Sequence, residues 1–448
     1  MSSSTSAFHQ LDTQPVGRIF LRYLLPSMIG MLLMAVNIVA DGIMVGNRLG
    51  PEALAGVGIA APVYTIFVAL SLWIGIGAAT KYSMAMGAKR VAEARVIFTH
   101  ALFSIFLFTL LIGLAAFLLR DPLAYALGAN QDTFPYVSDY LYVILLFGFV
   151  FTIENTFSVF VRNDGAPNLS MAALVVSASA NIILNYIFLY IFDFGVAGAA
   201  SATIIAAFLA ILVLASHFLK KSGNLRIVRF TFDKKLFWLI IVIGFPSFLS
   251  EIGISVFTIS HNVAFERTAG TDGVAAFSIL NYVHSVMLMM FLGMGSAIQP
   301  LISYYHGADN QRRKRETVQK ASLTAILAGA AFFFIGQLAA GPIVSIFGDF
   351  SSDVTALATL GIQLFFIAYL FTGTNFVMMT YYQSVGNVRM AIWITAAREI
   401  VVMFVFLLIL PPLLGVNGIW LAIPASEFLV FVSILLYQRK AQVRAVQR

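Results

Sequence analysis

The sequence predicts an all-α polytopic membrane protein, with twelve transmembrane helices in two six-helix lobes related by a pseudo-twofold axis along the membrane normal. Three observations predict this fold: an apolar composition, twelve long apolar segments and an ordered internal repeat. Of the 448 residues, 60% are hydrophobic and only 10% are Asp, Glu, Lys or Arg. Soluble proteins average about 25% charged residues. The composition therefore excludes a soluble enzyme and a soluble nucleic-acid-binding protein.

The apolar segments have the length that a bilayer requires. A membrane core about 30 Å thick needs about 20 mostly apolar residues per helix. Several segments exceed that minimum, so we expect helices that tilt or extend beyond the lipid. The twelve predicted spans are 19–46, 54–86, 96–119, 137–161, 169–192, 196–219, 237–265, 274–305, 318–340, 354–384, 389–412 and 417–437.

The distribution of Lys and Arg predicts the orientation, because cytoplasmic segments carry an excess of both. With the N-terminus in the cytoplasm, 22 of the 27 Lys and Arg lie on inner segments and three, Arg48, Arg120 and Arg267, lie on outer loops. If one span had been missed, every later loop would be assigned to the opposite side of the membrane, and the asymmetry would be lost. We therefore expect both termini in the cytoplasm, with the net charge of +7 facing the cytosolic leaflet. This placement leaves no charge pattern that calls for a nucleic-acid partner.

The two halves of the chain share landmarks in the same order. A shift of 220 residues pairs Pro26 with Pro246 and Gly50 with Gly270, and the segment GVAG at 195–198 meets GVNG at 415–418. Each half carries six predicted spans, an even number, so both copies share one orientation. Such parallel repeats are typical of carriers with a central binding cavity between two lobes.

The predicted boundaries follow from the spans and the repeat. They are a cytoplasmic tail at 1–17, an N-lobe at 18–219, a basic cytoplasmic linker at 220–236, a C-lobe at 237–437 and a second tail at 438–448. The first tail is polar and lacks the apolar core of a signal peptide.

Missing motifs narrow the chemistry. The chain has no Cys, which excludes disulfides and thiolate metal sites. No GxxxxGK[ST] phosphate loop and no HExxH metal motif occurs. We expect a protein that is not an enzyme, holds no resident cofactor or firm metal site, and uses an ion gradient.

Ionisable groups at membrane depth are costly and are functional candidates. Asp41 lies late in the first span, one turn after Asn37 on the same helix face. On the fifth span, Asn181 and Asn185 form part of a polar stripe that recurs every four residues. Lipid disfavours such a stripe, so we expect it to face the lobe interior, where a carboxylic acid can load and release a proton. Interhelical hydrogen bonding is the alternative role for the two amides.

Two further candidates lie near this stripe in the predicted fold. Asn155, next to Glu154 on the fourth span, could complete the pocket around Asp41. Pro26 shares the first span with Asp41, and proline kinks a helix by removing one backbone hydrogen bond. Protonation of Asp41 could change the bend at Pro26; a static kink is the alternative.

The chain resembles the multidrug and toxic compound extrusion (MATE) family, and within it the DinF/MepA-like bacterial branch. The resemblance spans nearly the whole chain. In the first half it rests on LPSMIGMLLMAVNIVADGIMVGNRLGPEALAGVGIA (25–60) and NIILNYIFLYIFDFGVAGAASAT (181–203). In the second half it rests on FPSFLSEIGISVFTISHN (245–262), YYQSVGNVRMAIWITAAREIV (381–401) and GVNGIWLAIP (415–424). It implies export of lipophilic, often cationic compounds in exchange for protons or Na⁺.

The resemblance also implies a cation- or proton-coupling site in the N-lobe. Its motif residues match Pro26, Asp41, Asn181 and Thr203 of this sequence. The family usually reads NxxLD on the fifth span, whereas this chain has Asn at position 185. Asp41 is therefore the principal acid of the predicted pocket. The loss of the second carboxylate weakens a Na⁺ cage, because hard cations favour carboxylate oxygens.

The C-lobe offers a second set of polar residues at membrane depth. Glu251, Asn281, His284 and Arg398 are candidates for a second coupling or substrate site. The alternative for His284 is a satisfied interior histidine. Arg398 and Glu399 are adjacent in sequence, so we expect their side chains to point in different directions, with Arg398 paired to an acid across a helix interface.

These features together predict a secondary active multidrug exporter in a bacterial cytoplasmic membrane, acting as a monomer by proton-coupled antiport. Its partners would be the lipid bilayer and small hydrophobic or cationic drugs, for which 41 Phe and 16 Met supply a deformable aromatic surface. Na⁺-coupled antiport and a lipid-linked precursor flippase are the alternatives. A membrane enzyme and a channel are weaker ones.

Overall fold

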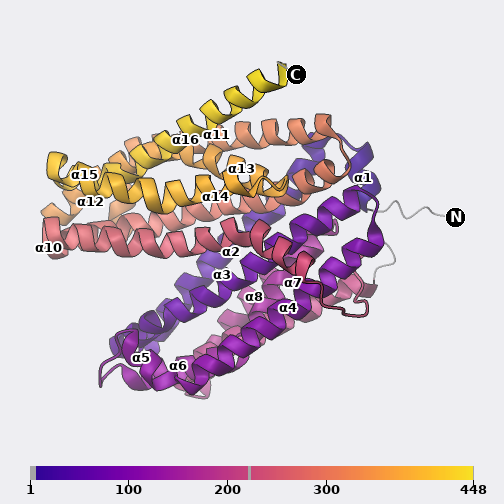
Figure 1. Cartoon of the computed structure of the whole chain (residues 1–448). Coiled ribbons are helices and arrows are strands. Elements are labelled where there is room, and N and C mark those ends of the chain that lie inside the picture. Colours follow the sequence, from indigo (N-terminus) through magenta and orange to yellow (C-terminus); the bar gives the residue numbers. More distant parts are fainter. Residues whose placement is uncertain (1–6, 220–222, 447–448) are drawn as a thin grey trace. The chain divides into compact units, whose positions relative to one another are not determined.

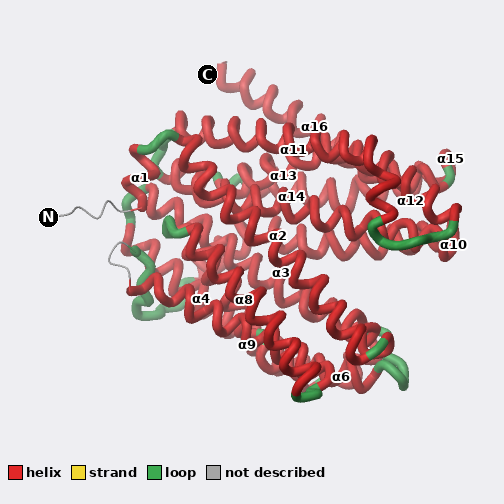
Figure 2. The backbone as a smooth tube through the Cα atoms, turned by 180° about the vertical axis from the view of Figure 1, so that it is seen from behind, coloured by secondary structure: helices red, strands yellow, loops and turns green. Residues whose placement is uncertain are grey.

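The computed structural model describes residues 7–219 and 223–446, and within these ranges all regular secondary structure is helical (Figures 1 and 2). Parts of three predicted segments lie outside the described residues: 1–6 of the first tail, 220–222 of the linker and 447–448 of the second tail.

The helices of the first half of the chain begin with a short helix and continue with span-length helices. They are α1 (Ala7–Thr13), α2 (Val16–Leu49), α3 (Pro51–Gly87), α4 (Val91–Leu118), α5 (Arg120–Ala126), α6 (Phe134–Phe147), α7 (Phe149–Asn163), α8 (Pro167–Tyr186), the π-helix η1 (Ile187–Ile191), α9 (Gly195–Ala215) and the 3₁₀-helix η2 (Ser216–Leu219).

The second half begins with one very long helix. Its elements are α10 (Lys234–Gly307), α11 (Gln311–Ser345), α12 (Ser352–Phe365), the 3₁₀-helix η3 (Phe366–Ala368), α13 (Tyr369–Ser384), α14 (Val388–Ala396), the π-helix η4 (Ala397–Val401), α15 (Val402–Leu414) and α16 (Val416–Val446).

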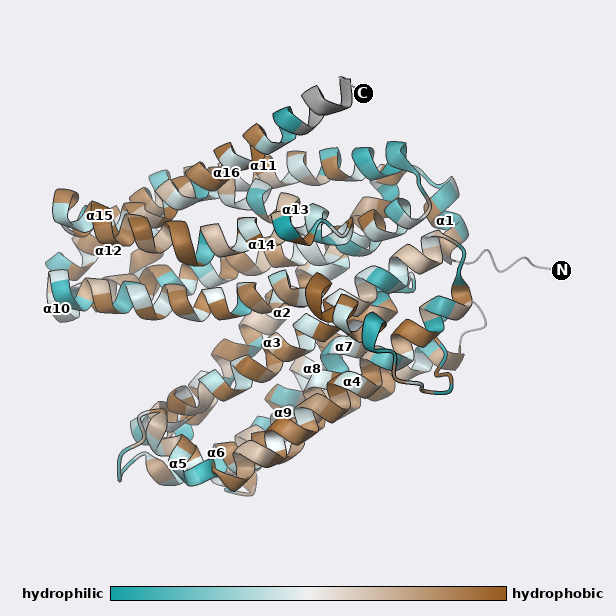
Figure 3. Cartoon of the chain, in the orientation of Figure 1, coloured by the Kyte–Doolittle hydropathy of each residue, from teal (hydrophilic) through white to brown (hydrophobic). Residues whose placement is uncertain are grey.

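The described helices account for twelve membrane crossings. Ten are long and apolar enough to cross a membrane, and the pair α6 and α7, bent by 53° at Gly148, makes an eleventh span. The 74-residue helix α10 contains two spans, because Gly270 interrupts its helical backbone with φ 59° and ψ −151°. Figure 3 shows that hydrophobic residues dominate along these helices. Many large apolar side chains are exposed, such as Leu118 and Leu338 at 83% each, as expected of helices that face lipid.

The backbone confirms the internal repeat. Within the described residues, eight glycines have positive φ, and they form four pairs one repeat apart. Turns that require this conformation therefore recur at matching positions in both halves. The pairs are Gly50 with Gly270, Gly128 with Gly348, Gly165 with Gly386 and Gly195 with Gly415.

Backbone contacts divide the described chain into two compact units. The first contains the residues up to Phe248 together with Pro300–Lys314. The second contains Leu249–Gln299 and the residues from Arg315 onward. The first unit therefore includes both ends of α10 as well as the first half of the chain.

Close backbone packing explains why the beginning of α10 joins the first unit. The indole Nε1 of Trp73 on α3 donates to the carbonyl of Ile241 at 2.7 Å. A Cβ on Gly77 would overlap the backbone of α10 at Ile240 and Gly244. Glycine at this contact lets the two helices approach more closely than any other residue would allow.

The predicted N-terminal tail contains α1, which docks onto the first unit. Phe8 and Leu11 are 8% and 5% exposed, and Phe8 stacks on Tyr304 with ring centroids 5.3 Å apart. Arg313 Nη1 donates to the carbonyls of Leu11 and Gln14 at 2.7 and 2.8 Å. This short helix is held by tertiary contacts, as seven residues are too few for a helix that is stable in isolation.

Candidate functional site

Asp41 lies on α2 at the centre of a hydrogen-bonded group from three helices. Asn185 on α8 donates from its Nδ2 to Asp41 Oδ1 at 2.6 Å. Asn181, one turn earlier on α8, contacts Thr203 on α9 at 3.1 Å between side-chain atoms. Asn37 lies one turn before Asp41 on α2, and its Oδ1 is 3.1 Å from the side-chain amide of Asn181. The structure therefore brings together five of the predicted site residues.

The amide of Asn181 has one orientation that satisfies its neighbours. With its oxygen 3.1 Å from Thr203 Oγ1, its nitrogen donates to Asp41 Oδ1 at 2.6 Å and to Asn37 Oδ1 at 3.1 Å. In the opposite orientation the Asn181 oxygen accepts from Asn185 Nδ2 at 3.2 Å but faces the oxygens of an ionised Asp41 and of Asn37, which cannot donate to it. Asp41 Oδ1 thus accepts from both amides of α8, and this arrangement stabilises an ionised carboxylate.

The polar stripe on α8 faces the interior of the first unit. Asn181 and Asn185 are 2% and 0% exposed. The same helix approaches α2 closely, since a Cβ on Gly30 would lie 2.7 Å from Leu174 Cδ1. The carbonyl oxygen of the Asn185 side chain is buried and has no hydrogen-bond partner in the described structure. This free acceptor belongs to the same amide that donates to Asp41.

Asn155 and Glu154 on α7 lie outside this hydrogen-bonded group. Asn155 Nδ2 donates to Ser71 Oγ on α3 at 3.1 Å, and no bond joins it to Asp41 among the described residues. Glu154 is 8% exposed, and its Oε1 has no hydrogen-bond partner in the described part of the chain. The structure therefore places Asn155 at a contact between α3 and α7, and its participation in coupling stays a prediction.

Pro26 is buried inside α2, fifteen residues before Asp41. The helix runs without interruption from Val16 to Leu49. Pro26 and Asp41 thus belong to one helix, as the sequence predicts. A change in the bend of α2 on protonation remains a prediction.

The predicted C-lobe residues form two separate contacts. His284 Nδ1 on α10 lies 2.9 Å from the hydroxyl of Tyr369. Arg398 in η4 lies within 3.4 Å of Glu427 on α16, which confirms an ion pair across a helix interface. Asn281 and Glu251 take part in neither contact. His284 interacts electrostatically with Arg398, and Glu251 interacts with Glu399 next to it, so a common C-lobe site stays a prediction.

The expectation that Arg398 and Glu399 point in different directions is wrong. Both side chains are buried, and Arg398 Nη2 donates to Glu399 Oε1 at 2.5 Å. Both residues lie in the π-helix η4 at Ala397–Val401, and the long, flexible side chain of Arg398 reaches back to the carboxylate of its neighbour. Turns of this kind are frequent at functional sites.

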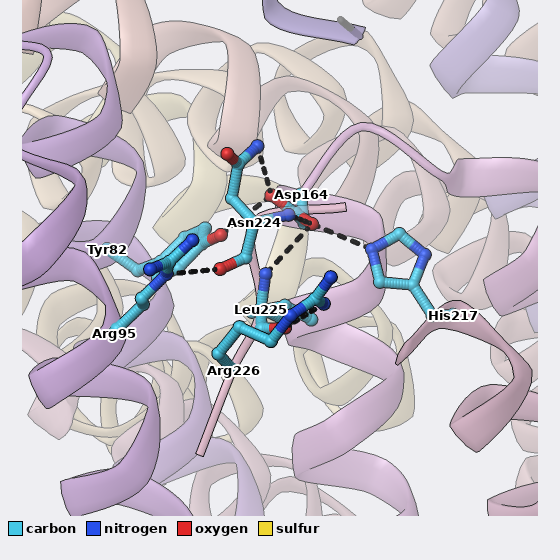
Figure 4. A network of polar contacts seen from close by, with 7 residues as sticks. All are labelled: Tyr82, Arg95, Asp164, His217, Asn224, Leu225 and Arg226. Atoms are coloured by element: carbon cyan, nitrogen blue, oxygen red, sulfur yellow. Dashed lines mark hydrogen bonds and ion pairs between the residues drawn. The ribbon is translucent and has the colours of Figure 1, made fainter. Parts of the chain in front are cut away.

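A buried carboxylate that was not predicted from the sequence holds the linker. Asp164, directly after α7, accepts hydrogen bonds at 2.7 Å from each of three groups: the Tyr82 hydroxyl, His217 Nε2 and the backbone N–H of Asn224 (Figure 4). The backbone N–H of Leu225 adds a fourth bond to this carboxylate, at 3.3 Å. Asp164 therefore fixes the described end of the linker between the two halves. The available signal was an acidic residue in the short turn RNDGAP (162–167), directly after a predicted span.

The group around Asp41 contains few of the side chains that commonly bind metal ions. The described residues contain no group of three or more His, Asp or Glu side chains that could hold a metal. Asp41 supplies one carboxylate among amide and hydroxyl groups. Oxygen-rich carboxylate sets are what Ca²⁺ and Mg²⁺ prefer.

Comparison with known proteins identifies the family. A family model described as MatE matches residues 26–187 and 246–409. The chain belongs to the MATE family. The two matched segments begin 220 residues apart, at 26 and 246, which is the shift of the internal repeat.

Similar proteins place this MATE family transporter in the MepA-like branch. It is 26% identical over 438 residues to "Multidrug export protein MepA" of Staphylococcus aureus (strain MRSA252), covering 96% of this chain and 95% of the relative. It is also 26% identical to the protein of the same name from Staphylococcus saprophyticus, over 93% and 92% of the two chains.

Solved structures confirm the fold of twelve helices in two lobes. A crystal structure of MATE in complex with MaL6 matches with a TM-score of 0.92 at 24% identity over 100% of both chains. A crystal structure of MATE in the bent conformation matches with a TM-score of 0.89 at 25% identity over 98% of both chains.

Proposed function

We propose that this protein is a multidrug exporter of a bacterial cytoplasmic membrane that exchanges lipophilic, cationic compounds for protons. The relatives named as multidrug export proteins support the export function, because they align over nearly the entire chain. The observation that carries proton coupling is the Asp41 site, where one carboxylate is held by amides of a neighbouring helix. The protein would work as a monomer with both termini in the cytoplasm, and H⁺ would be its coupling ion.

A proton on Asp41 would change the contact between α2 and α8. An ionised carboxylate only accepts hydrogen bonds, whereas a carboxylic acid also donates one. Asp41 Oδ1 accepts from both Asn181 and Asn185, so protonation weakens these bonds or requires one amide to turn. Asn185 Oδ1, a buried acceptor without a partner in the described structure, is available to the new donor. Proton binding would thereby be converted into a displacement of helices.

Exchange requires only that binding of the drug lowers the affinity for the proton and that binding of the proton lowers the affinity for the drug. Coupling between two binding events is reciprocal, so a proton that lowers the affinity for the drug is itself displaced by the drug. The drug and the proton compete for the negative charge of Asp41. The ionised side chain attracts a cationic compound, whereas the protonated side chain does not. One-for-one exchange of a proton for a monovalent cation moves no net charge, so the pH gradient drives it, with about 1.4 kcal/mol, or about tenfold accumulation, per pH unit.

The alternatives receive less support from the described residues. A Na⁺ site would rest on a single carboxylate, since Asn occupies position 185. A flippase for anionic lipid-linked precursors would need free positive charge in its cavity. Arg398, the buried arginine of the C-lobe, is already paired with Glu399 and Glu427.

Efflux of a fluorescent cation from cells or proteoliposomes tests the proposal. We expect efflux to stop when a proton ionophore collapses the pH gradient and to continue when a Na⁺ ionophore collapses the sodium gradient. The opposite pattern would establish Na⁺ coupling. Absence of cation efflux under both gradients, with the purified protein folded, would contradict the export function.

A further inference from the structure

A second buried charge cluster lies in the second unit, separate from the Asp41 site. Its members are Arg398 and Glu399 in η4, Glu427 on α16 and Asn375 on α13, exposed by 5%, 8%, 4% and 0%. Arg398 also lies over the ring of Phe376, 3.8 Å from its centroid. A cluster this deeply buried is costly to form unless its charges balance.

The charges of the cluster do not balance when both carboxyls are ionised. Arg398 bonds Glu399 Oε1 and lies 3.4 Å from Glu427 Oε1, so one guanidinium serves two carboxylates. Glu251 on α10 interacts electrostatically with Glu399 and adds another acid. One bound proton brings the Arg398, Glu399 and Glu427 group to neutrality.

The neighbouring titratable groups do not supply the missing positive charge. They are His261 and His284 on α10 and Tyr369 on α13. A protonated His284 would face Arg398, a like charge, and its Nδ1 is already engaged with the Tyr369 hydroxyl. Tyr369 can contribute only a neutral or negative group.

The hydrogen bonds indicate which oxygen takes the proton. Ser250 Oγ donates to Glu399 Oε1 at 3.0 Å, and Asn375 Nδ2 donates to Glu427 Oε2 at 2.6 Å. Glu399 Oε2 is buried against Gly253 and has no hydrogen-bond partner in the described structure. A proton added to this oxygen breaks none of the hydrogen bonds that the other carboxyl oxygens accept, so Glu399 Oε2 is the favoured position.

From these contacts we propose that the Arg398–Glu399–Glu427 cluster is a second proton-binding site, in which Glu399 Oε2 takes one proton from water. The proton adds to a carboxylate lone pair, and the net charge of the cluster rises by one. Arg398 then shifts its pairing toward Glu427, whose Oε1 is already 3.4 Å from the guanidinium Nε. The site does not depend on Asp41 or on drug transport.

Infrared difference spectra of the purified protein between two pH values test the proposal without transport. Asp41→Asn provides the background, so that Asp41 contributes no carboxyl band. In this background we expect one titrating carboxylic-acid band to shift to higher frequency in Ser250→Ala, because the C=O of Glu399 then accepts one hydrogen bond fewer. The same band should disappear in Glu399→Gln. Circular dichroism checks that each variant retains its helices.

Two further variants separate the cluster from its neighbours. Glu427→Gln leaves Arg398 with one carboxylate, so charges balance and the band should also disappear. Glu251→Gln removes an acid but leaves Arg398 with two carboxyl partners, Glu399 and Glu427. It therefore serves as the matched control and should keep the band. A band that persists in Glu399→Gln and Glu427→Gln, or that is lost only in Glu251→Gln, would overturn the proposal. Failure of Asp41 as the coupling acid would leave all these results unchanged.

Discussion

The anchor at Asp164 predicts that one substitution releases the linker between the two halves. Its side chain is fully buried, and it accepts hydrogen bonds from Tyr82, His217 and two backbone N–H groups of the linker. Asp164→Ala removes the acceptor for all of these donors. The cost of breaking a buried charged group of this kind is about 3–5 kcal/mol. Two of the donors can turn to water as the linker opens, so we take the lower end, about 3 kcal/mol.

Limited digestion with an arginine-specific protease measures this change, because the arginines of the linker are Arg226, half-buried, and Arg229, exposed. Cleavage that requires local opening follows the equilibrium between closed and open linker. A loss of about 3 kcal/mol therefore predicts cleavage about a hundredfold faster. The readout is the rate at which the full chain is split into two halves on a gel.

Graded variants make this reasoning testable. Tyr82→Phe removes one hydrogen bond to the carboxylate, worth about 1.5 kcal/mol, so cleavage should be about tenfold faster. Asp164→Asn keeps one acceptor oxygen and should fall between Tyr82→Phe and Asp164→Ala. Cleavage of Asp164→Ala at the wild-type rate, with the helices intact by circular dichroism, would refute the role of Asp164 as the anchor.

Three other predictions concern packing, the N-terminal helix and the coupling site. Gly244→Ala should lower stability by about 2 kcal/mol, because the new Cβ would overlap a carbonyl oxygen of α3. Gly58→Ala, which has open space around it, is the control and should not lower stability. Thermal unfolding compares the two variants. Arg313→Ala removes two hydrogen bonds to the end of α1, so amide exchange over residues 7–14 should accelerate at least tenfold, and exposed Arg312→Ala should have no such effect. Asn185→Asp adds a second carboxylate to the pocket and should make efflux respond to Na⁺; efflux that stays indifferent to a Na⁺ ionophore would contradict this.

Much of the fold could be predicted, because hydropathy and charge are read along the chain without tertiary information. The spans, the Lys and Arg asymmetry and the Gly50–Gly270 pairing all depend on local sequence. The docked helix α1 could not be predicted in this way, as its stability comes from Tyr304 and Arg313, nearly 300 residues away. The bend between α6 and α7 at Gly148 likewise lies inside an apolar run that reads as one span.

The candidate site was predictable where helical spacing governs it. Asn37 and Asp41 share a face of α2, and Asn181 and Asn185 share a face of α8, so an interval of four residues is informative. Arg398 and Glu399 illustrate the limit of this reasoning. Ordinary α-helical spacing directs their Cβ atoms apart, yet the flexible Arg398 side chain folds back and joins Glu399 in one buried cluster at η4.

Substrate-driven proton movement in the Asp41→Asn variant tests the central claim most directly. Asp193→Asn, the same chemical change at a side chain 70% exposed, is the matched control. In proteoliposomes containing a pH indicator, addition of a cationic drug should move protons with the wild type and Asp193→Asn and should move none with Asp41→Asn. Proton movement at the wild-type rate in folded Asp41→Asn would contradict the account.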